Sequence, residues 1–207
     1  MDTTIDWDLI LPCSGDSDRN SVQREDALIR AAAAGDEEAF RQLVQQYQDP
    51  VYRFAFQWLG NVEDAREVCQ DTFVKIYPAL RRYQRKGKFT TWLFAITLNL
   101  CRDRKKSKAY RQSERTGSFR EDDSIDKEAL ATDTSPSETA SRKDDIELMM
   151  QGIDLLPEKL KSTVILKGVE GLSNEECAEV LRCSPRAVEG RLYRAKQILS
   201  EWWKDQK

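Results

Sequence analysis

Two segments of the chain combine positive charge with side chains that can contact nucleic-acid bases. The first lies between residues 86 and 106 and contains Lys86, Lys88, Phe89, Trp92, Asn99, Arg102, Arg104, Lys105 and Lys106. Cations neutralise backbone phosphates and aromatic rings accept unstacked bases, so this mixture suits single-stranded or melted nucleic acid. The same spacing also fits a solvated helix whose aromatic residues pack into a core.

The second segment has the pattern of a helix-turn-helix. Ser173 and Glu176 form an S-x-x-E capping box before a short apolar helix, and a three-residue turn leads to Ser184 and Pro185 as the N-cap and first residue of a second helix. On this second helix the apolar face comprises Val188, Leu192, Ala195, Leu199 and Trp202, and the opposite face comprises Arg186, Gly190, Tyr193 and Gln197, with Glu189 and Arg194 at its edges. A recognition helix needs this division, because one face docks on the preceding helix while the other enters the major groove. The alternative is an ordinary surface helix with a solvated basic face.

No group of residues has the pattern of a catalytic site. The chain has no histidine, which excludes Ser-His triads and HExxH zinc sites. Asp64, Glu67 and Asp71 form an acidic run, but no glycine-rich loop or positioned nucleophile accompanies it, which favours a solvated helix face. We therefore expect the protein not to be an enzyme and to hold neither a metal nor a cofactor.

Charge is distributed in blocks that the formal total of −3 hides. Residues 81–115 hold twelve basic and two acidic residues, a net of +10, and residues 182–207 hold seven and three, a net of +4. Residues 1–38 hold ten acidic and three basic residues, and residues 116–147 hold ten and four, so their nets are −7 and −6. Two basic regions separated by an acidic one fit contact with nucleic acid at two places.

Apolar residues recur at helical spacing on both sides of a polar segment, which predicts an all-α chain with two small helical domains joined by a flexible acidic linker. The predicted parts are an acidic, mobile N-terminal extension (1–26), a helical bundle (27–112), the linker (113–142) and a helix-turn-helix domain (143–207). Stripes beginning near Phe40, Ala65 and Thr90 predict the main helices of the bundle, the first of them bent at Pro50.

The five cysteines have no CxxC spacing, which predicts reduced thiols rather than a disulfide framework or a zinc ribbon. No apolar stretch is long enough to span a membrane, and the acidic N-terminus is not a signal peptide. These features predict a cytoplasmic protein without membrane insertion.

The order of these segments resembles the extracytoplasmic-function (ECF, group 4) sigma factors of bacterial RNA polymerase. The resemblance lies in DAREVCQDTFVKIYPAL at 64–80, FTTWLFAITLNLCRDRKK at 89–106 and LPEKLKSTVILKGVEGLSNEECAEVLRCSPRAVEGRLYRAKQIL at 156–199. It implies that the first domain is a sigma-2 domain that binds core polymerase and the −10 element, and that the second is a sigma-4 domain that binds the −35 element. It also implies four partners: the β′ coiled coil and the β flap of core RNA polymerase, promoter DNA, and an anti-sigma factor.

The resemblance implies roles for individual residues. Contact with core polymerase falls on Asp64, Glu67, Gln70, Asp71 and Phe73. Contact with melted −10 DNA falls on Tyr83, Lys88, Trp92, Asn99, Arg102, Lys105 and Lys106, and contact with the −35 duplex falls on Lys167, Arg186, Glu189, Gly190, Tyr193 and Arg194. The chemistry agrees, because an asparagine amide can pair with a base edge and a tyrosine ring can stack on a base.

Two positions depart from the pattern of many relatives. Glu189 stands where Lys or Arg is common, and Ala95 stands where Arg is common. A carboxylate repels phosphate but can accept a hydrogen bond from cytosine N4. The −35 sequence that relatives with Lys or Arg at this position recognise therefore does not transfer to this chain. The acidic N-terminal extension is also unusual, and is either a shield for the basic surfaces or a mobile tail. A free-standing helix-turn-helix regulator that binds duplex DNA without polymerase is the alternative function, and a helical adaptor is a third.

Overall fold

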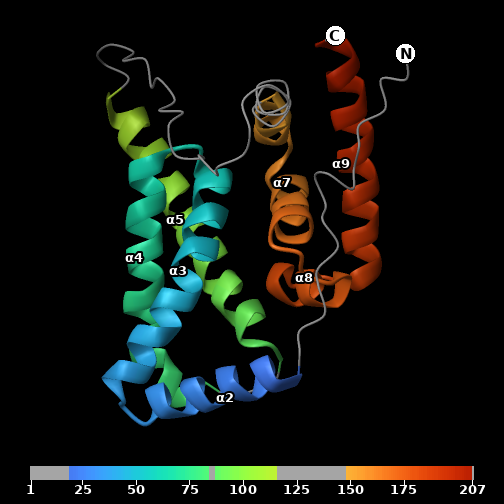
Figure 1. Cartoon of the computed structure of the whole chain (residues 1–207). Coiled ribbons are helices and arrows are strands. Elements are labelled where there is room, and N and C mark those ends of the chain that lie inside the picture. The colour runs from blue at the N-terminus through green and yellow to red at the C-terminus, as the bar shows by residue number, and fades with distance from the viewer. Residues whose placement is uncertain (1–18, 84–86, 116–147, 207) are drawn as a thin grey trace, which may run out of the picture. The chain divides into compact units, whose positions relative to one another are not determined.

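The computed structural model describes residues 19–83, 87–115 and 148–206, and within these ranges all regular structure is helical (Figure 1). The helices form two compact units, one built from described residues between 19 and 115 and the other from residues 148–206, and residues 60–62 are grouped with the second unit. The predicted all-α fold with two helical domains is therefore confirmed. Residues 1–18 of the predicted extension and nearly all of the predicted linker lie outside the described residues.

The first unit contains four α-helices and one short 3-10 helix: α2 (Arg19–Ala33), α3 (Glu37–Leu59), α4 (Val62–Ala79), η1 (Leu80–Arg82) and α5 (Phe89–Arg115). Helix α2 starts inside the predicted acidic extension, so residues 19–26 are helical. Within α2, Glu25 accepts a hydrogen bond from the hydroxyl of Tyr47 on α3. Together with the buried Ile29 and Ala32 of α2, this contact holds α2 against the bundle, and a count of charges does not predict it.

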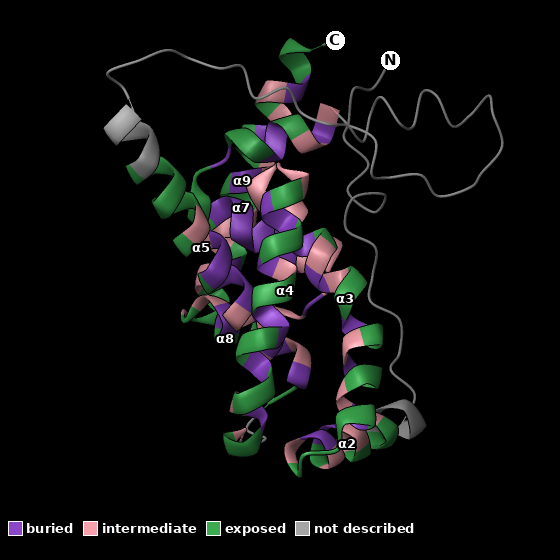
Figure 2. Ribbon diagram, turned by 90° about the vertical axis from the view of Figure 1, so that its left-hand side faces the viewer, coloured by how far each residue is buried: buried purple, intermediate pink, exposed green. Residues whose placement is uncertain are grey.

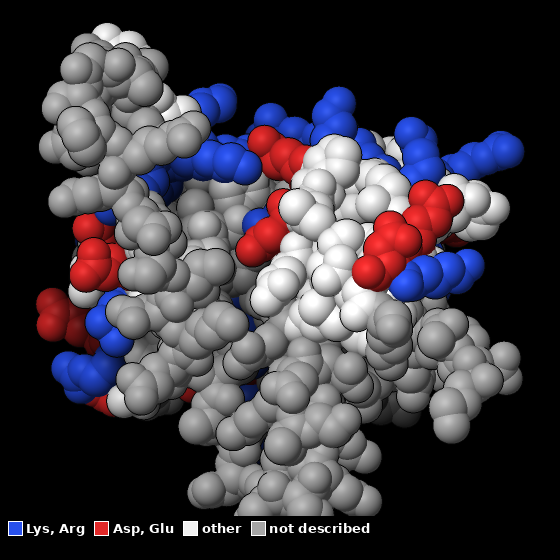
Figure 3. Space-filling model, turned by 90° about the horizontal axis from the view of Figure 1, so that it is seen from above, with Lys and Arg blue, Asp and Glu red and all other residues white. Residues whose placement is uncertain are grey.

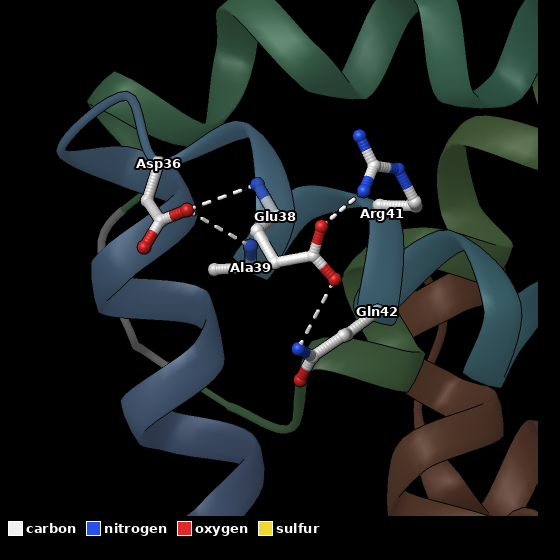
Figure 4. A network of polar contacts seen from close by, with 5 residues as sticks. All are labelled: Asp36, Glu38, Ala39, Arg41 and Gln42. Atoms are coloured by element: carbon white, nitrogen blue, oxygen red, sulfur yellow. Dashed lines mark hydrogen bonds and ion pairs between the residues drawn. The ribbon is translucent and has the colours of Figure 1, made fainter.

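Helix α3 has a well-formed start and passes through Pro50 as a single element. Asp36 Oδ1 accepts hydrogen bonds from the backbone N–H groups of Glu38 (2.9 Å) and Ala39 (3.1 Å), as an N-cap does (Figure 4). One turn further on, Glu38 forms an ion pair with Arg41 and accepts a hydrogen bond from Gln42 Nε2 at 3.5 Å (Figure 4). Local side-chain contacts therefore define where α3 begins.

The core of the first unit lies between α3, α4 and α5, and includes the buried residues Leu43, Val51, Ile76 and Leu93. Two buried hydroxyls also lie at the α4–α5 contact, with Thr72 Oγ1 and Thr97 Oγ1 3.4 Å apart. Each donates to the carbonyl four residues earlier in its own helix, at 2.7 and 3.0 Å, so neither is left unsatisfied. Figure 2 shows the exposed bands that remain along α4.

The second unit contains a helix over residues 148–155, α7 (Glu158–Val164), a π-helical segment η2 (Ile165–Val169), α8 (Asn174–Leu181) and α9 (Pro185–Asp205). Gly152 lets the first of these helices approach α9 closely, because a Cβ there would lie 2.8 Å from ring atoms of Trp202. Trp203, rather than Trp202, is the buried tryptophan of α9. None of the helices in the described part of the chain combines the length and the apolar character needed to cross a membrane.

Candidate nucleic-acid and partner interfaces

The helix-turn-helix of the second unit is fixed by its caps. Ser173 accepts a hydrogen bond from the backbone N–H of Glu176 at 3.2 Å, and Glu176 accepts one from the backbone N–H of Ser173 at 2.7 Å. Ser184 caps α9 by accepting from the backbone N–H of Ala187 at 3.2 Å. Between the helices Arg182 has φ 50° and ψ 54°, a left-handed conformation that ends α8. The structure therefore has the capped helix, tight turn and capped helix that the sequence predicts.

Helix α9 is divided into a buried face and an exposed face. Val188, Ala195 and Leu199 are buried on one side. On the opposite side the predicted −35 residues Arg186, Glu189, Tyr193 and Arg194 are exposed, and Gly190 is half-buried. This division leaves the polar first turns of α9 accessible to a groove of duplex DNA.

Two hydrogen bonds order the exposed face of α9. Arg194 Nε donates to the backbone carbonyl of Gly190 at 3.3 Å, so its side chain lies back along the helix. Tyr193, which is 65% exposed, accepts a hydrogen bond from Gln197 Nε2 at 3.2 Å. The exposed face therefore presents partly preorganised polar groups.

Lys167, the remaining predicted −35 residue, lies in the π-helical segment η2. A hydrogen bond from Glu170 N to Ile165 O at 3.2 Å marks the widened turn. The pKa of Glu175 is lowered by its own backbone hydrogen bond and by Ser173, with a smaller contribution from the charge of Lys167. Lys167 is therefore near the start of α8, beside the helix-turn-helix.

On α5 the predicted −10 residues do not all share one face. Trp92, Asn99, Arg102 and Lys106 lie on the side opposite the buried residues Leu93, Phe94, Thr97, Leu98 and Cys101. Asn99 is exposed, as is Lys88 just before the helix. Lys105 points elsewhere, with its Nζ 5.5 Å from the centre of the Trp58 ring, in a cation–π contact.

Tyr83 and Trp92 pack together at the start of α5. Their ring centres are 4.7 Å apart, and Phe89 contacts both rings at 5.8 and 5.7 Å. Phe89 is buried and also contacts Tyr47 at 5.3 Å, whereas Tyr83 and Trp92 are only half-buried. The cluster therefore joins the core to a surface that carries Lys88 and Asn99.

Asp64, predicted to contact polymerase, is buried in an ion-pair network between α4 and α5. Its oxygens accept from Arg104 Nε at 2.7 Å and from Lys108 Nζ at 3.0 Å, and Arg104 also pairs with Glu67. Burial raises the pKa of Asp64, but the hydrogen bonds from Arg104 and Lys108 outweigh this and hold the pKa below its ordinary value. On the face shown in Figure 3, basic and acidic side chains lie side by side.

The outward face of α4 carries Glu67, Gln70 and Asp71, all exposed. Phe73, the fifth residue predicted to contact polymerase, points into the core and is 9% exposed. Two apolar or aromatic residues outside the predicted set share the outward face: Val74 is 70% exposed and Tyr77 is 40% exposed. The signal that could have found Val74 is its apolar type at three, four and seven residues from the exposed polar ones.

The surroundings of two described thiols, Cys69 and Cys177, disfavour the thiolate form. Burial, together with the charge of Asp49, raises the pKa of Cys69 to about 11, and burial raises that of Cys177 to about 12. Among the described residues, no three His, Cys, Asp or Glu side chains are grouped so that they could hold a metal ion.

Two family models match this chain: Sigma-70 region 2 over residues 43–111 and Sigma-70 region 4 over residues 146–199. The RNA polymerase sigma-H factor of Pseudomonas aeruginosa is 27% identical over 86% of this chain and 93% of its own length. The ECF RNA polymerase sigma factor SigW of Bacillus subtilis is 29% identical over 86% of this chain and 95% of its own. CnrH, solved in complex with the cytosolic domain of CnrY, is similar in structure with a TM-score of 0.66 and 27% identity, covering 89% of this chain and 99% of that one.

The matches to Sigma-70 region 2 and region 4, one in each helical unit, place the chain among the DNA-binding proteins of the transcription machinery. The chain belongs to the sigma-70 family, in its extracytoplasmic-function group, and is an RNA polymerase sigma factor. These relatives do not favour the alternative of a free-standing regulator.

Proposed function

We propose that this sigma factor distributes promoter recognition over three surfaces. The outward face of α4 binds core polymerase, the exposed face of α5 captures melted −10 DNA, and the exposed face of α9 reads the −35 duplex. The observation that supports this most directly is the division of α9, whose buried face carries Val188 and Ala195 while Arg186 and Tyr193 stand exposed on the other. Residues 19–115 and 148–206 would then act as the sigma-2 and sigma-4 domains.

The polymerase contact is assigned to Glu67, Gln70 and Asp71 together with Val74 and Tyr77. An exposed apolar side chain ringed by charged ones is the usual composition of a protein interface, and Val74 is 70% exposed at its centre. Asp64 and Phe73 support this surface from behind, the first through Arg104 and the second through the core. The β flap of polymerase would contact the second unit.

The −10 contact is assigned to the surface formed by Tyr83, Lys88, Trp92 and Asn99, with Arg102 and Lys106 for the backbone. Asn99 offers an amide to a base edge, and the packed rings of Tyr83 and Trp92 offer a stacking platform next to it. Capture of unpaired bases would drive melting, so the chain needs no catalytic group of its own. We place this activity in the cytoplasm, where polymerase works.

An anti-sigma factor is proposed as a further partner. The relative CnrH was solved in complex with the cytosolic domain of CnrY. The sigma factor RpoE of Bartonella quintana, whose fold is similar with a TM-score of 0.65 and 21% identity, was co-crystallised with the anti-sigma factor NepR. A protein that covered α4 or α9 would block polymerase or promoter by occupying the same side chains.

The decisive experiment is reconstitution with core polymerase. Run-off transcription over genomic fragments should start at specific promoters only when both core polymerase and this chain are present. Equally tight promoter binding by the purified chain alone would contradict the proposal.

The −10 surface is tested by replacing Asn99 with alanine. Asn99→Ala should lower permanganate reactivity of the −10 region more than it lowers formation of the closed complex. Gln46→Ala, which removes an exposed amide from α3, should leave both unchanged. Equal losses in opening and in closed-complex binding would argue against base capture by Asn99.

A further inference from the structure

Glu189 is the one carboxylate in the first turns of α9, over residues 185–194, where it stands among the cations. Glu189 is exposed, and within the described residues it forms no ion pair, although Arg186 lies three residues earlier on the same helix. It does have one hydrogen-bond partner, because Asn174 Nδ2 donates to Glu189 Oε1 at 3.5 Å. Glu189 is therefore not neutralised by a cation of the described chain, and its one polar contact is a long one to Asn174.

Asn174 connects the two helices of the helix-turn-helix. It is the first residue of α8, and its Oδ1 is buried with no hydrogen-bond partner in the described part of the structure. A flip of the amide would bring Oδ1 against the carboxylate of Glu189, so the contact favours the orientation in which Nδ2 faces Glu189. The second carboxylate oxygen of Glu189, Oε2, makes no hydrogen bond within the described chain.

A carboxylate at this place is unfavourable beside DNA unless a base donates to it. Phosphates repel it, guanine shows two acceptors in the major groove, and thymine shows an acceptor and a methyl group. Adenine has an N6 donor, but its N7 acceptor lies alongside. Cytosine offers the N4 amino group, which is the donor that Glu or Asp side chains accept from.

We infer that Glu189 is a specificity-determining residue that selects a cytosine in the −35 duplex through its N4 amino group, and that Asn174 positions it. This inference rests on the proposed function, in which the exposed face of α9 reads the −35 element. The cations on the same face, Arg186 and Arg194, then supply affinity while the one acid supplies discrimination.

The test uses holoenzyme made from core polymerase and the full chain, with a duplex library randomised over the −35 element and fixed elsewhere. Sequencing of the bound fraction should show one position with a cytosine preference of about five- to a hundredfold, the range for one well-placed base contact. Glu189→Ala should flatten the preference at that position. Glu189→Gln should move it to adenine, because a glutamine amide pairs with adenine N6 and N7.

Two further variants control the experiment. Glu201→Gln removes an exposed carboxylate from the same helix, beyond the turns that would enter the groove, and should change no base preference. Asn174→Ala should keep the cytosine preference at the same position but reduce it by less than Glu189→Ala does. A merely structural role for Asn174 would instead change the thermal unfolding of the second unit and leave the base preference as in the wild type.

The outcomes separate the inference from the function on which it rests. If the wild type selects a −35 sequence and neither Glu189 variant alters any position, the inference is overturned and the proposed function stands. If the wild-type holoenzyme selects no upstream sequence at all, the proposed role of α9 fails first. Because a cytosine on either strand appears as a G·C pair, a wild-type preference for an A·T pair that depends on Glu189 would also overturn the inference.

Discussion

Helices α5 and α9 both carry clusters of cations, but these cations differ in the contacts that they make within the protein. On α5, Arg104 and Lys108 bind Asp64 and Lys105 lies over Trp58. On α9, Arg194 donates to a backbone carbonyl of its own helix and forms no ion pair with the described residues. Helix α5, which lies in the region with the larger net charge, therefore uses several of its cations in contacts within the protein. Helix α9 presents more of its positive charge to solvent. A charge count along the sequence overstates the electrostatic attraction of α5 for DNA.

The largest expected effect comes from removing the carboxylate that pairs with the α5 cations Arg104 and Lys108. Asp64→Ala removes a carboxylate whose side chain is 9% exposed and leaves Arg104 and Lys108 without it. Loss of one partner of a buried pair costs about 3–5 kcal/mol, and the partial exposure of the two cations reduces this to about 2–3 kcal/mol. Amide hydrogen exchange across α4 and α5 should show the loss, while Asp71→Ala, an exposed change on the same helix, should cost less than about 0.5 kcal/mol. Similar losses for both variants would mean that the network does not hold α4 to α5.

The same network predicts a pH dependence. Because the folded pKa of Asp64 is below its ordinary value of 3.8, its contribution to stability is complete above that value and disappears as the pH falls through the folded pKa. Acid unfolding of the first unit should therefore steepen below about pH 4 in the wild type. In Asp64→Asn this loss of stability below about pH 4 should be absent. If the acid unfolding curve of that variant matches the wild type, other carboxylates cause the effect.

A smaller effect distinguishes the cations of the two helices in DNA binding. Arg194→Ala should weaken holoenzyme binding to −35 duplex about tenfold and reduce the slope of log affinity against log salt by about 0.9, the value for one phosphate contact. Lys105→Ala should change the slope for −10 DNA by less than half of that, because its ammonium is engaged by Trp58. Equal slope changes would show that the Trp58 contact does not restrain Lys105.

The smallest expected effect concerns the turn before α9. Arg182 adopts φ 50°, which costs a side-chain-bearing residue roughly 1 kcal/mol relative to glycine. Arg182→Gly should therefore stabilise the second unit by about 0.5–1 kcal/mol in chemical denaturation. Arg191→Gly, the same exchange inside α9, should destabilise by about 1 kcal/mol. If both variants lose stability, the arginine side chain at 182 makes a contact that outweighs the backbone strain.

The parts of the fold that depend on neighbouring residues were predictable from sequence. The Ser173–Glu176 capping box and the Ser184 N-cap involve residues three positions apart, and the structure confirms both. The division of α9 into two faces arises from helical spacing in the same way.

The parts that depend on distant residues were not predictable. Asp64 looked like an exposed acid because its partner Arg104 is forty positions away. Phe73 was assigned to a surface, but the packing of α4 against its neighbours turns it inward and leaves Val74 outward. Helical spacing put Trp202 on the apolar face of α9, but Trp203 is the buried tryptophan, because tertiary packing at the end of α9 determines which ring is covered.

The π-helical segment η2 has a consequence for how this chain can change in length. A π turn accommodates one residue more than an α turn, so Ile165–Val169 holds the equivalent of a one-residue insertion. Deleting one residue there would convert the turn to α geometry, while the residues on either side keep the faces that they present to their neighbours. A deletion inside α7 itself, where no wide turn absorbs it, would instead rotate the residues before it by about 100°. The π turn is therefore a point at which the domain could gain or lose one residue without rebuilding the packing of α7 or the helix-turn-helix.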